Sequence, residues 1–106
     1  MNERLLARRY TKALIGHGHH SISLKDLEAV VSIVSSAVQH EELSRLISSP
    51  SLSVKHKLKI IAPILEKASS PKIVKQFLTI IIQKQRGALL PYIEQELQIE
   101  LAELKN

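Results

Sequence analysis

Three histidines stand close together near the N-terminus, at His17, His19 and His20, and Gly16 and Gly18 lie among them. Neutral imidazole nitrogens bind zinc and other divalent metals, and a glycine-containing loop can wrap around one ion. The segment offers no carboxylate, however, and the chain has no Cys. A solvated turn is therefore favoured over a metal site, and we expect neither a metal nor another cofactor.

Residue types that could catalyse a reaction are scarce. Without Cys there is no thiolate nucleophile, and three glycines are too few for a phosphate-binding loop or a dinucleotide fingerprint. The serines fall where helix caps and loops are expected, and they do not combine with a base and an orienting group. We expect a protein that is not an enzyme.

Positive charge is concentrated in one stretch. The net charge of the chain is +5, and its most basic part holds eight cations: Lys55, Lys57, Lys59, Lys67, Lys72, Lys75, Lys84 and Arg86. Such a run could contact nucleic acid, an acidic lipid surface or an acidic protein. Proteins that bind single strands combine such charge with stacking aromatics, and this chain has only Tyr10, Phe77 and Tyr92. A solvated helix face is favoured, and no nucleic acid is expected as a partner.

Length and composition indicate one small folded domain. The chain has 106 residues, 44% of them apolar, which is enough for a core without a disulfide or a structural metal. The longest apolar run, at residues 80–82, is far shorter than a membrane span or the core of a signal peptide. We expect a soluble protein that is not exported.

Helical periodicity runs through nearly the whole chain and predicts an all-α fold, a compact bundle of six helices. The first helix should end at Gly16 or Gly18. The second follows Ser23, which can form a capping box with Asp26. Apolar positions of the first helix are Leu6, Tyr10, Ala13 and Leu14, and those of the second are Leu24, Leu27, Val31, Val34 and Val38.

Two further helices are predicted in the middle of the chain. The third has apolar residues Leu43, Leu46 and Ile47 and ends in the loop of residues 48–51. Ser53 can cap the fourth, which Pro63 should kink or divide, because proline lacks the N–H and clashes with the carbonyl of Lys59. The fourth helix has apolar positions Val54, Leu58, Ile61 and Leu65.

The fifth helix carries two apolar stripes. Ser70 is its expected cap, with Pro71 in the first helical position. One stripe contains Val74, Leu78 and Ile81, and the other contains Ile73, Phe77 and Ile80. A helix this apolar is either buried centrally or keeps one stripe for a partner. In the second case its free stripe forms a groove with the first helix, and the small Ala13 lets a partner helix approach.

The sixth helix should hold Pro91 in its first turn. Its apolar positions are Ile93, Leu97, Leu101 and Leu104, and its acidic residues Glu94, Glu96, Glu100 and Glu103 are expected to face water.

Four segments resemble the delta subunit of bacterial F-type ATP synthases, the family of the oligomycin-sensitivity-conferring protein. Residues 7–14, Ala-Arg-Arg-Tyr-Thr-Lys-Ala-Leu, resemble its opening helix. Residues 46–50 resemble the loop after its third helix, residues 74–78 its fifth helix, and residues 86–91 the entry to its sixth. The four segments occur in the family's order across nearly the whole chain.

The resemblance implies a non-catalytic part of the peripheral stalk, the stator of the synthase. Residues 1–106 then form a single helical domain like the N-terminal domain of a longer, two-domain subunit. The resemblance also implies a C-terminal domain that meets the b subunits, and residues 1–106 are too few to include it. The location implied is the cytoplasmic face of the bacterial inner membrane, peripherally, within the synthase.

In that family a groove between the first and fifth helices receives the N-terminal helix of an alpha subunit. The positions expected to form such a groove here are Leu6, Tyr10, Ala13, Ile73, Phe77, Ile80 and Lys84. Two alternatives from other classes are a small helical RNA-binding protein resembling transcription-antitermination factor B, which also begins with an Arg-rich helix, and a metal-sensing domain using the three histidines.

Overall fold

Six α-helices form the part of the chain that the computed structural model describes, which is residues 2–16, 21–68 and 70–106. Those residues contain no strand, so the all-α prediction is confirmed. A short 3₁₀ helix, η2, precedes the last α-helix. The elements are α1 (Glu3–Ile15), α2 (Leu24–Gln39), α3 (Glu41–Ser48), α4 (Val54–Lys67), α5 (Lys72–Gln83), η2 (Gly87–Leu89) and α6 (Leu90–Lys105).

Capping side chains start the helices where the sequence predicts. Ser23 Oγ accepts a hydrogen bond of 3.1 Å from the Asp26 N–H, and Ser53 Oγ accepts one of 3.1 Å from the His56 N–H. The cap of α3 was not foreseen: Nδ1 of His40 accepts from the Leu43 N–H at 3.1 Å. These bonds satisfy donors that the first helical turn leaves free.

Pro63 was expected to kink or divide the fourth helix, and it does not divide it, because α4 is one element from Val54 to Lys67. Pro63 and Lys59 are both exposed. Water can therefore reach the Lys59 carbonyl, which loses its helical donor to the proline.

The predicted start of α5 is also corrected. Pro71 is the N-cap, with an extended backbone, and no side chain caps the helix. The Ser70 N–H instead donates to the Leu65 carbonyl at 3.3 Å, at the end of α4. Ser70 is thus held by the preceding helix, and α5 begins one residue later than expected.

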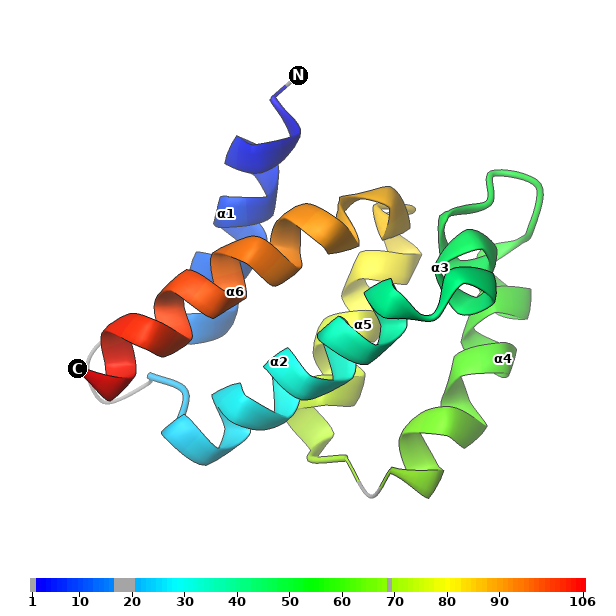
Figure 1. The fold of residues 1–106 in the computed structure, drawn as a ribbon. Coiled ribbons are helices and arrows are strands. Elements are labelled where there is room, and N and C mark those ends of the chain that lie inside the picture. The colour runs from blue at the N-terminus through cyan, green and yellow to red at the C-terminus, as the bar shows by residue number, and fades with distance from the viewer. Residues whose placement is uncertain (1, 17–20, 69) are drawn as a thin grey trace.

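Helix α6 packs against both α1 and α2. It runs beside α2 and is crossed by α1, while α3 and α4 lie on the far side of α2 and α5 (Figure 1). The largest fully buried side chains come from α2, α5 and α6, among them Leu27, Leu78, Ile81, Ile93 and Leu97. The expected burial of Leu24 and Leu104 is wrong, since these residues lie at helix ends and are exposed.

The end of α5 turns the chain into η2. The Arg86 N–H donates to the Ile81 carbonyl and the Gln85 N–H to the Ile82 carbonyl, both at 2.9 Å. This pair of bonds is a Schellman motif, and it places Gln85 in the left-handed region with φ 55°. Gly87 follows, buried against Ile47 of α3.

Candidate partner-binding groove

An apolar hollow of about 250 Å³ lies between α1 and α5. Its lining residues repeat at helical spacing on both walls, at i, i+3, i+4 along α1 and at i, i+3, i+4, i+7 along α5. They are Tyr10, Ala13 and Leu14 from α1, and Ile73, Gln76, Phe77 and Ile80 from α5. We call this hollow the α1–α5 groove. Its two walls are each one face of an amphipathic helix.

The floor of the α1–α5 groove belongs to the core, whereas its wall is open. Phe77 is only 6% exposed, and Tyr10 and Ile73 are half-buried against the core. Ile80, in contrast, is 46% exposed. The second stripe of α5 is therefore half-buried at Ile73, buried at Phe77 and open at Ile80, so the described residues do not cover the whole stripe.

Five of the seven residues expected at such a groove line it: Tyr10, Ala13, Ile73, Phe77 and Ile80. Leu6 does not line it and packs, half-buried, against the core. Lys84 does not line it either, because it caps the C-terminus of α5. Leu14 and Gln76 are additional members. The place of Leu14 in the groove could be predicted from the apolar periodicity of α1. The place of Gln76 could not, because a polar residue does not stand out in an apolar pattern.

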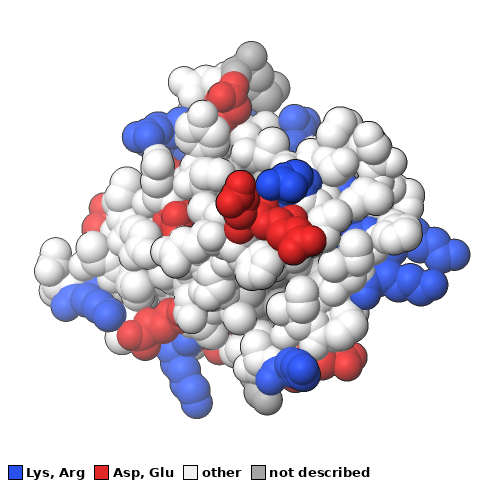
Figure 2. Space-filling model, turned by 45° about the vertical axis from the view of Figure 1, so that its right-hand side comes forward, with Lys and Arg blue, Asp and Glu red and all other residues white. Residues whose placement is uncertain are grey.

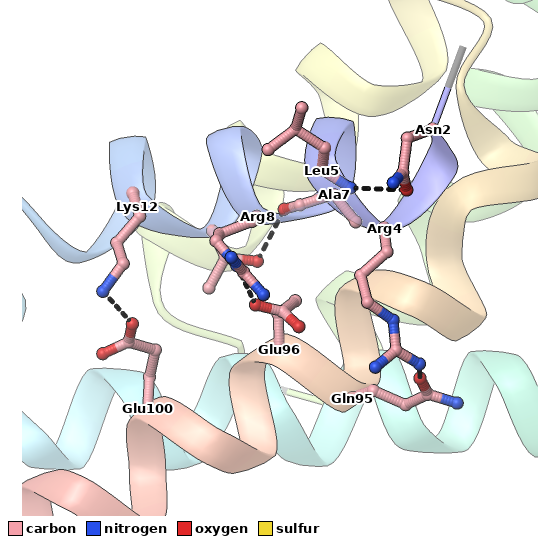
Figure 3. A network of polar contacts seen from close by, with 10 residues as sticks. Asn2, Arg4, Leu5, Ala7, Arg8, Lys12, Gln95, Glu96 and Glu100 are labelled. Carbon is pink, nitrogen blue, oxygen red and sulfur yellow. Dashed lines mark hydrogen bonds and ion pairs between the residues drawn. The ribbon is translucent and has the colours of Figure 1, made fainter.

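Polar contacts hold α1 on α6 (Figure 3). Nε of Arg8 donates to Oε1 of Glu96 at 3.0 Å, and Lys12 pairs with Glu100. The prediction that Glu96 faces water is wrong, because α1 covers it and leaves it 6% exposed. Glu100 is partly covered in the same way.

The hydrogen bond to Glu100, together with its negative charge, raises the pKa of the Lys12 ammonium above its usual 10.5. Lys12 therefore stays charged throughout the neutral range. Nearer the N-terminus of α1, Arg4 donates to Oε1 of Gln95 at 2.7 Å, which extends the same line of contacts.

A larger apolar hollow, of about 450 Å³, lies between α2, α3 and α4. Sequence reasoning did not single it out. Ile60, Ile64 and Leu65 line it from α4, and Ile64 is 43% exposed. This second hollow is roomier than the α1–α5 groove, so any test of partner binding has to distinguish the two.

The basic residues differ in their exposure and in their neighbours. Lys57, counted among the candidate phosphate contacts, is only 4% exposed. On the face that brings α3 and α4 forward, some basic side chains lie together at the right-hand edge, and others are separated by acidic residues and uncharged surface (Figure 2). Phe77 is buried and Tyr10 half-buried, so neither offers a free stacking face for a nucleotide base.

The proposed metal ligands His17, His19 and His20 lie outside the described residues. Within the described ranges, no group of three or more His, Asp and Glu side chains is arranged to hold a metal ion. None of the helices in this same part of the chain is long and apolar enough to cross a membrane.

Fold and groove together define a small all-helical domain whose surface carries a trough with helical spacing on both walls. Residues 6–106 match the family model described as ATP synthase delta (OSCP) subunit. The chain belongs to this family.

Three relatives are named ATP synthase subunit delta. The protein of Aliarcobacter butzleri is 34% identical over 96% of this chain and 56% of its own length. That of Koribacter versatilis is 31% identical over 74% of this chain and 42% of its own. That of Acinetobacter baylyi is 31% identical over 86% of this chain and 51% of its own length. The chain thus spans about half the length of these curated relatives. No solved structure shows a significant match.

Proposed function

We propose that this chain is the N-terminal helical part of a delta subunit that serves as a non-catalytic stator component of an F-type ATP synthase. In this proposal the α1–α5 groove receives the N-terminal helix of an alpha subunit of the catalytic head. Contact with the b subunits belongs to a C-terminal domain outside the chain. The protein is then peripheral to the membrane, on the cytoplasmic face of the bacterial inner membrane, and is held there by the complex.

The exposed wall of the groove is the observation that carries the proposal. Amphipathic helices dock their apolar face into apolar grooves. One face of α5 lines such a groove with Ile73, Gln76, Phe77 and Ile80. Across from them, the exposed Ala13 leaves room for the backbone of an incoming helix. Membership of the delta family supports the same assignment.

A stator must hold still against the torque of rotation, which calls for slow dissociation. Buried apolar anchors in a preformed groove supply slow dissociation better than exposed ion pairs, each of which contributes about 0–1 kcal/mol. The exposed lysines of α4 and α5 favour a partner with acidic residues beside its apolar stripe, because complementary charge accelerates association.

Ile80→Asp is the substitution that tests the groove. The partner is a synthetic peptide with the sequence of the alpha subunit's N-terminal helix, and its affinity is measured by calorimetry. A charge placed on the open wall removes an apolar anchor, so affinity should fall about 30-fold or more. Phe77→Asp is unsuitable, because Phe77 is buried and its substitution would unfold the bundle.

Ile64→Asp is the matched control. Ile64 is 43% exposed in the second hollow, nearly the same as the 46% of Ile80, and the change is identical. The peptide should bind this variant with the affinity of the unmodified chain. Loss of binding in Ile64→Asp with retention in Ile80→Asp would move the site to the second hollow, and an unmodified chain that does not bind the peptide would refute the docking proposal.

A further inference from the structure

We propose that the Arg8–Glu96 and Lys12–Glu100 pairs are positioning contacts that set the width of the α1–α5 groove. Through these pairs α6 fixes the rotation of α1 about its own axis. The inference deepens the proposed function, on which its biological meaning rests. Its structural part concerns the free chain and can be tested without a partner.

The most deeply buried side chains of α1 are small. Only Ala7 and Thr11 are fully buried in this helix, and both side chains are small. The backbone of α1 lies against α6 and η2, whereas it stands off from α5. The larger apolar side chains of α1 that pack against the core are only half-buried, so the polar contacts of α1 with α6 contribute to its orientation. Those half-buried side chains are Leu6, Tyr10, Leu14 and Ile15.

Helical geometry places the ion pairs and the groove on opposite sides of the buried face of α1. Ala7 and Thr11 are four residues apart and form one buried ridge along α1. Each following residue is rotated by about 100°. Arg8 and Lys12, one position later, therefore lie on one flank, and Tyr10, one position before Thr11, lies on the other.

Rotation of α1 about the ridge of Ala7 and Thr11 thus acts on both flanks together. A rotation that lifts Arg8 and Lys12 away from α6 moves Tyr10 and Leu14 toward α5 and narrows the groove. The opposite rotation presses the cations into α6. The two pairs follow the same order along both helices, 8 with 96 and 12 with 100, so a slide along the axis breaks both (Figure 3).

Glu96 makes this restraint strong. Its side chain is 7% exposed, and Oε2 is buried without a hydrogen-bond partner among the described residues. A buried carboxylate that loses its cation is strongly unfavourable, which distinguishes this pair from exposed ion pairs. Arg8 lies 3.0 Å from Glu96, so a rotation that withdraws Arg8 while the rest of α1 still covers Glu96 leaves a buried charge uncompensated.

The test measures the separation of α1 from α5 in the free chain. Because the sequence has no Cys, Leu5→Cys and Lys75→Cys provide two unique exposed sites for nitroxide labels, one on each helix. Double electron–electron resonance then gives the distribution of distances between the labels. We expect Arg8→Gln to shift or broaden this distribution relative to the unsubstituted labelled chain.

Arg9→Gln is the control, because it removes the same charge from the neighbouring, exposed arginine and should leave the distribution unchanged. Arg8→Lys keeps the cation and should restore it. Superimposable distributions for the unsubstituted chain, Arg8→Gln and the double variant Arg8→Gln/Lys12→Gln would overturn the proposal. If circular dichroism shows that Arg8→Gln does not fold, Lys12→Gln is measured alone. A shifted or broadened distance distribution would then support the proposal, and an unchanged one would overturn it.

The affinity for the alpha-subunit peptide connects this restraint to the groove. Arg8→Gln should weaken peptide binding by about 2- to 30-fold, although Arg8 does not line the groove. Arg9→Gln should not weaken it. A shifted distance distribution with unchanged affinity would refute the connection. An unmodified chain that fails to bind the peptide refutes the proposed function, while the distance measurement still decides whether the ion pairs position α1.

Discussion

Gln85 and Gly87 divide two tasks that a single glycine often performs at the end of a helix. Gln85 is the residue with positive φ, in the Schellman motif that ends α5. Gly87 is needed for space: a Cβ there would lie 2.5 Å from the Ile47 carbonyl oxygen and 2.7 Å from Ile47 Cγ2. The glycine thus lies at the site of close approach, while the left-handed position carries a side chain.

This division predicts opposite effects for two substitutions. Gly87→Ala should lower the free energy of unfolding by about 1–3 kcal/mol, because the added methyl meets backbone atoms that cannot move aside. Gln85→Gly should raise it by up to about 1 kcal/mol, because glycine adopts positive φ without the steric penalty. Urea unfolding followed by circular dichroism measures both. A Gly87→Ala variant as stable as the unmodified chain would contradict the close approach.

The burial of Glu96 is a feature of a single residue that could not be predicted from the sequence. Its position beside the apolar stripe of α6 is typical of a solvent-facing carboxylate, and the sequence alone predicted that. Burial comes from α1, which is more than eighty residues away in the chain and covers Glu96 with Arg8. A local pattern contains no information on such a contact.

At the scale of elements, the helix starts were predictable because capping is local chemistry. Ser23 and Ser53 accept from the N–H three residues later, as their spacing predicts. The prediction failed at Ser70, which is bound by the end of α4 through its own N–H. Division of α4 at Pro63, one of the two expected effects, does not occur, because the sequence does not show whether an orphaned carbonyl can reach water.

Serine-to-alanine substitutions separate the two kinds of serine. Ser53→Ala removes a cap and should lower the free energy of unfolding by about 1 kcal/mol. Ser70→Ala is the control: its Oγ is buried with no hydrogen-bond partner in the described structure, so alanine loses no bond and should leave stability equal or slightly higher. Thermal unfolding compares them. Equal destabilisation by the two changes would contradict the capping assignment.

At the scale of the whole molecule, the α1–α5 groove could be anticipated because a surplus apolar stripe is visible in one helix. The second hollow could not, since Leu43, Ile64 and Leu78 come from three helices whose relative placement no periodicity encodes. Leu6 was misplaced for a related reason: the pattern identifies the apolar face of α1 but not which edge of that face meets the core.

Salt dependence distinguishes the proposed docking from the RNA-binding alternative. An RNA held by several Lys and Arg side chains would lose about 1000-fold in affinity between about 50 and about 200 mM salt. Docking of an apolar helix should change far less over that range, because its anchors are uncharged. The measurement titrates the chain with the alpha-subunit peptide and with a mixed-sequence single-stranded RNA. Salt-sensitive RNA binding without peptide binding would favour the alternative.

The contacts of α6 with both α1 and α2 have a consequence for how the chain is made. The first two helices rest on the last one, so during synthesis their apolar faces emerge from the ribosome long before the surface that covers them. A nascent chain released only through α5 has its early helices without their main partner. Native closure of the bundle therefore waits until the sixth helix has left the exit tunnel.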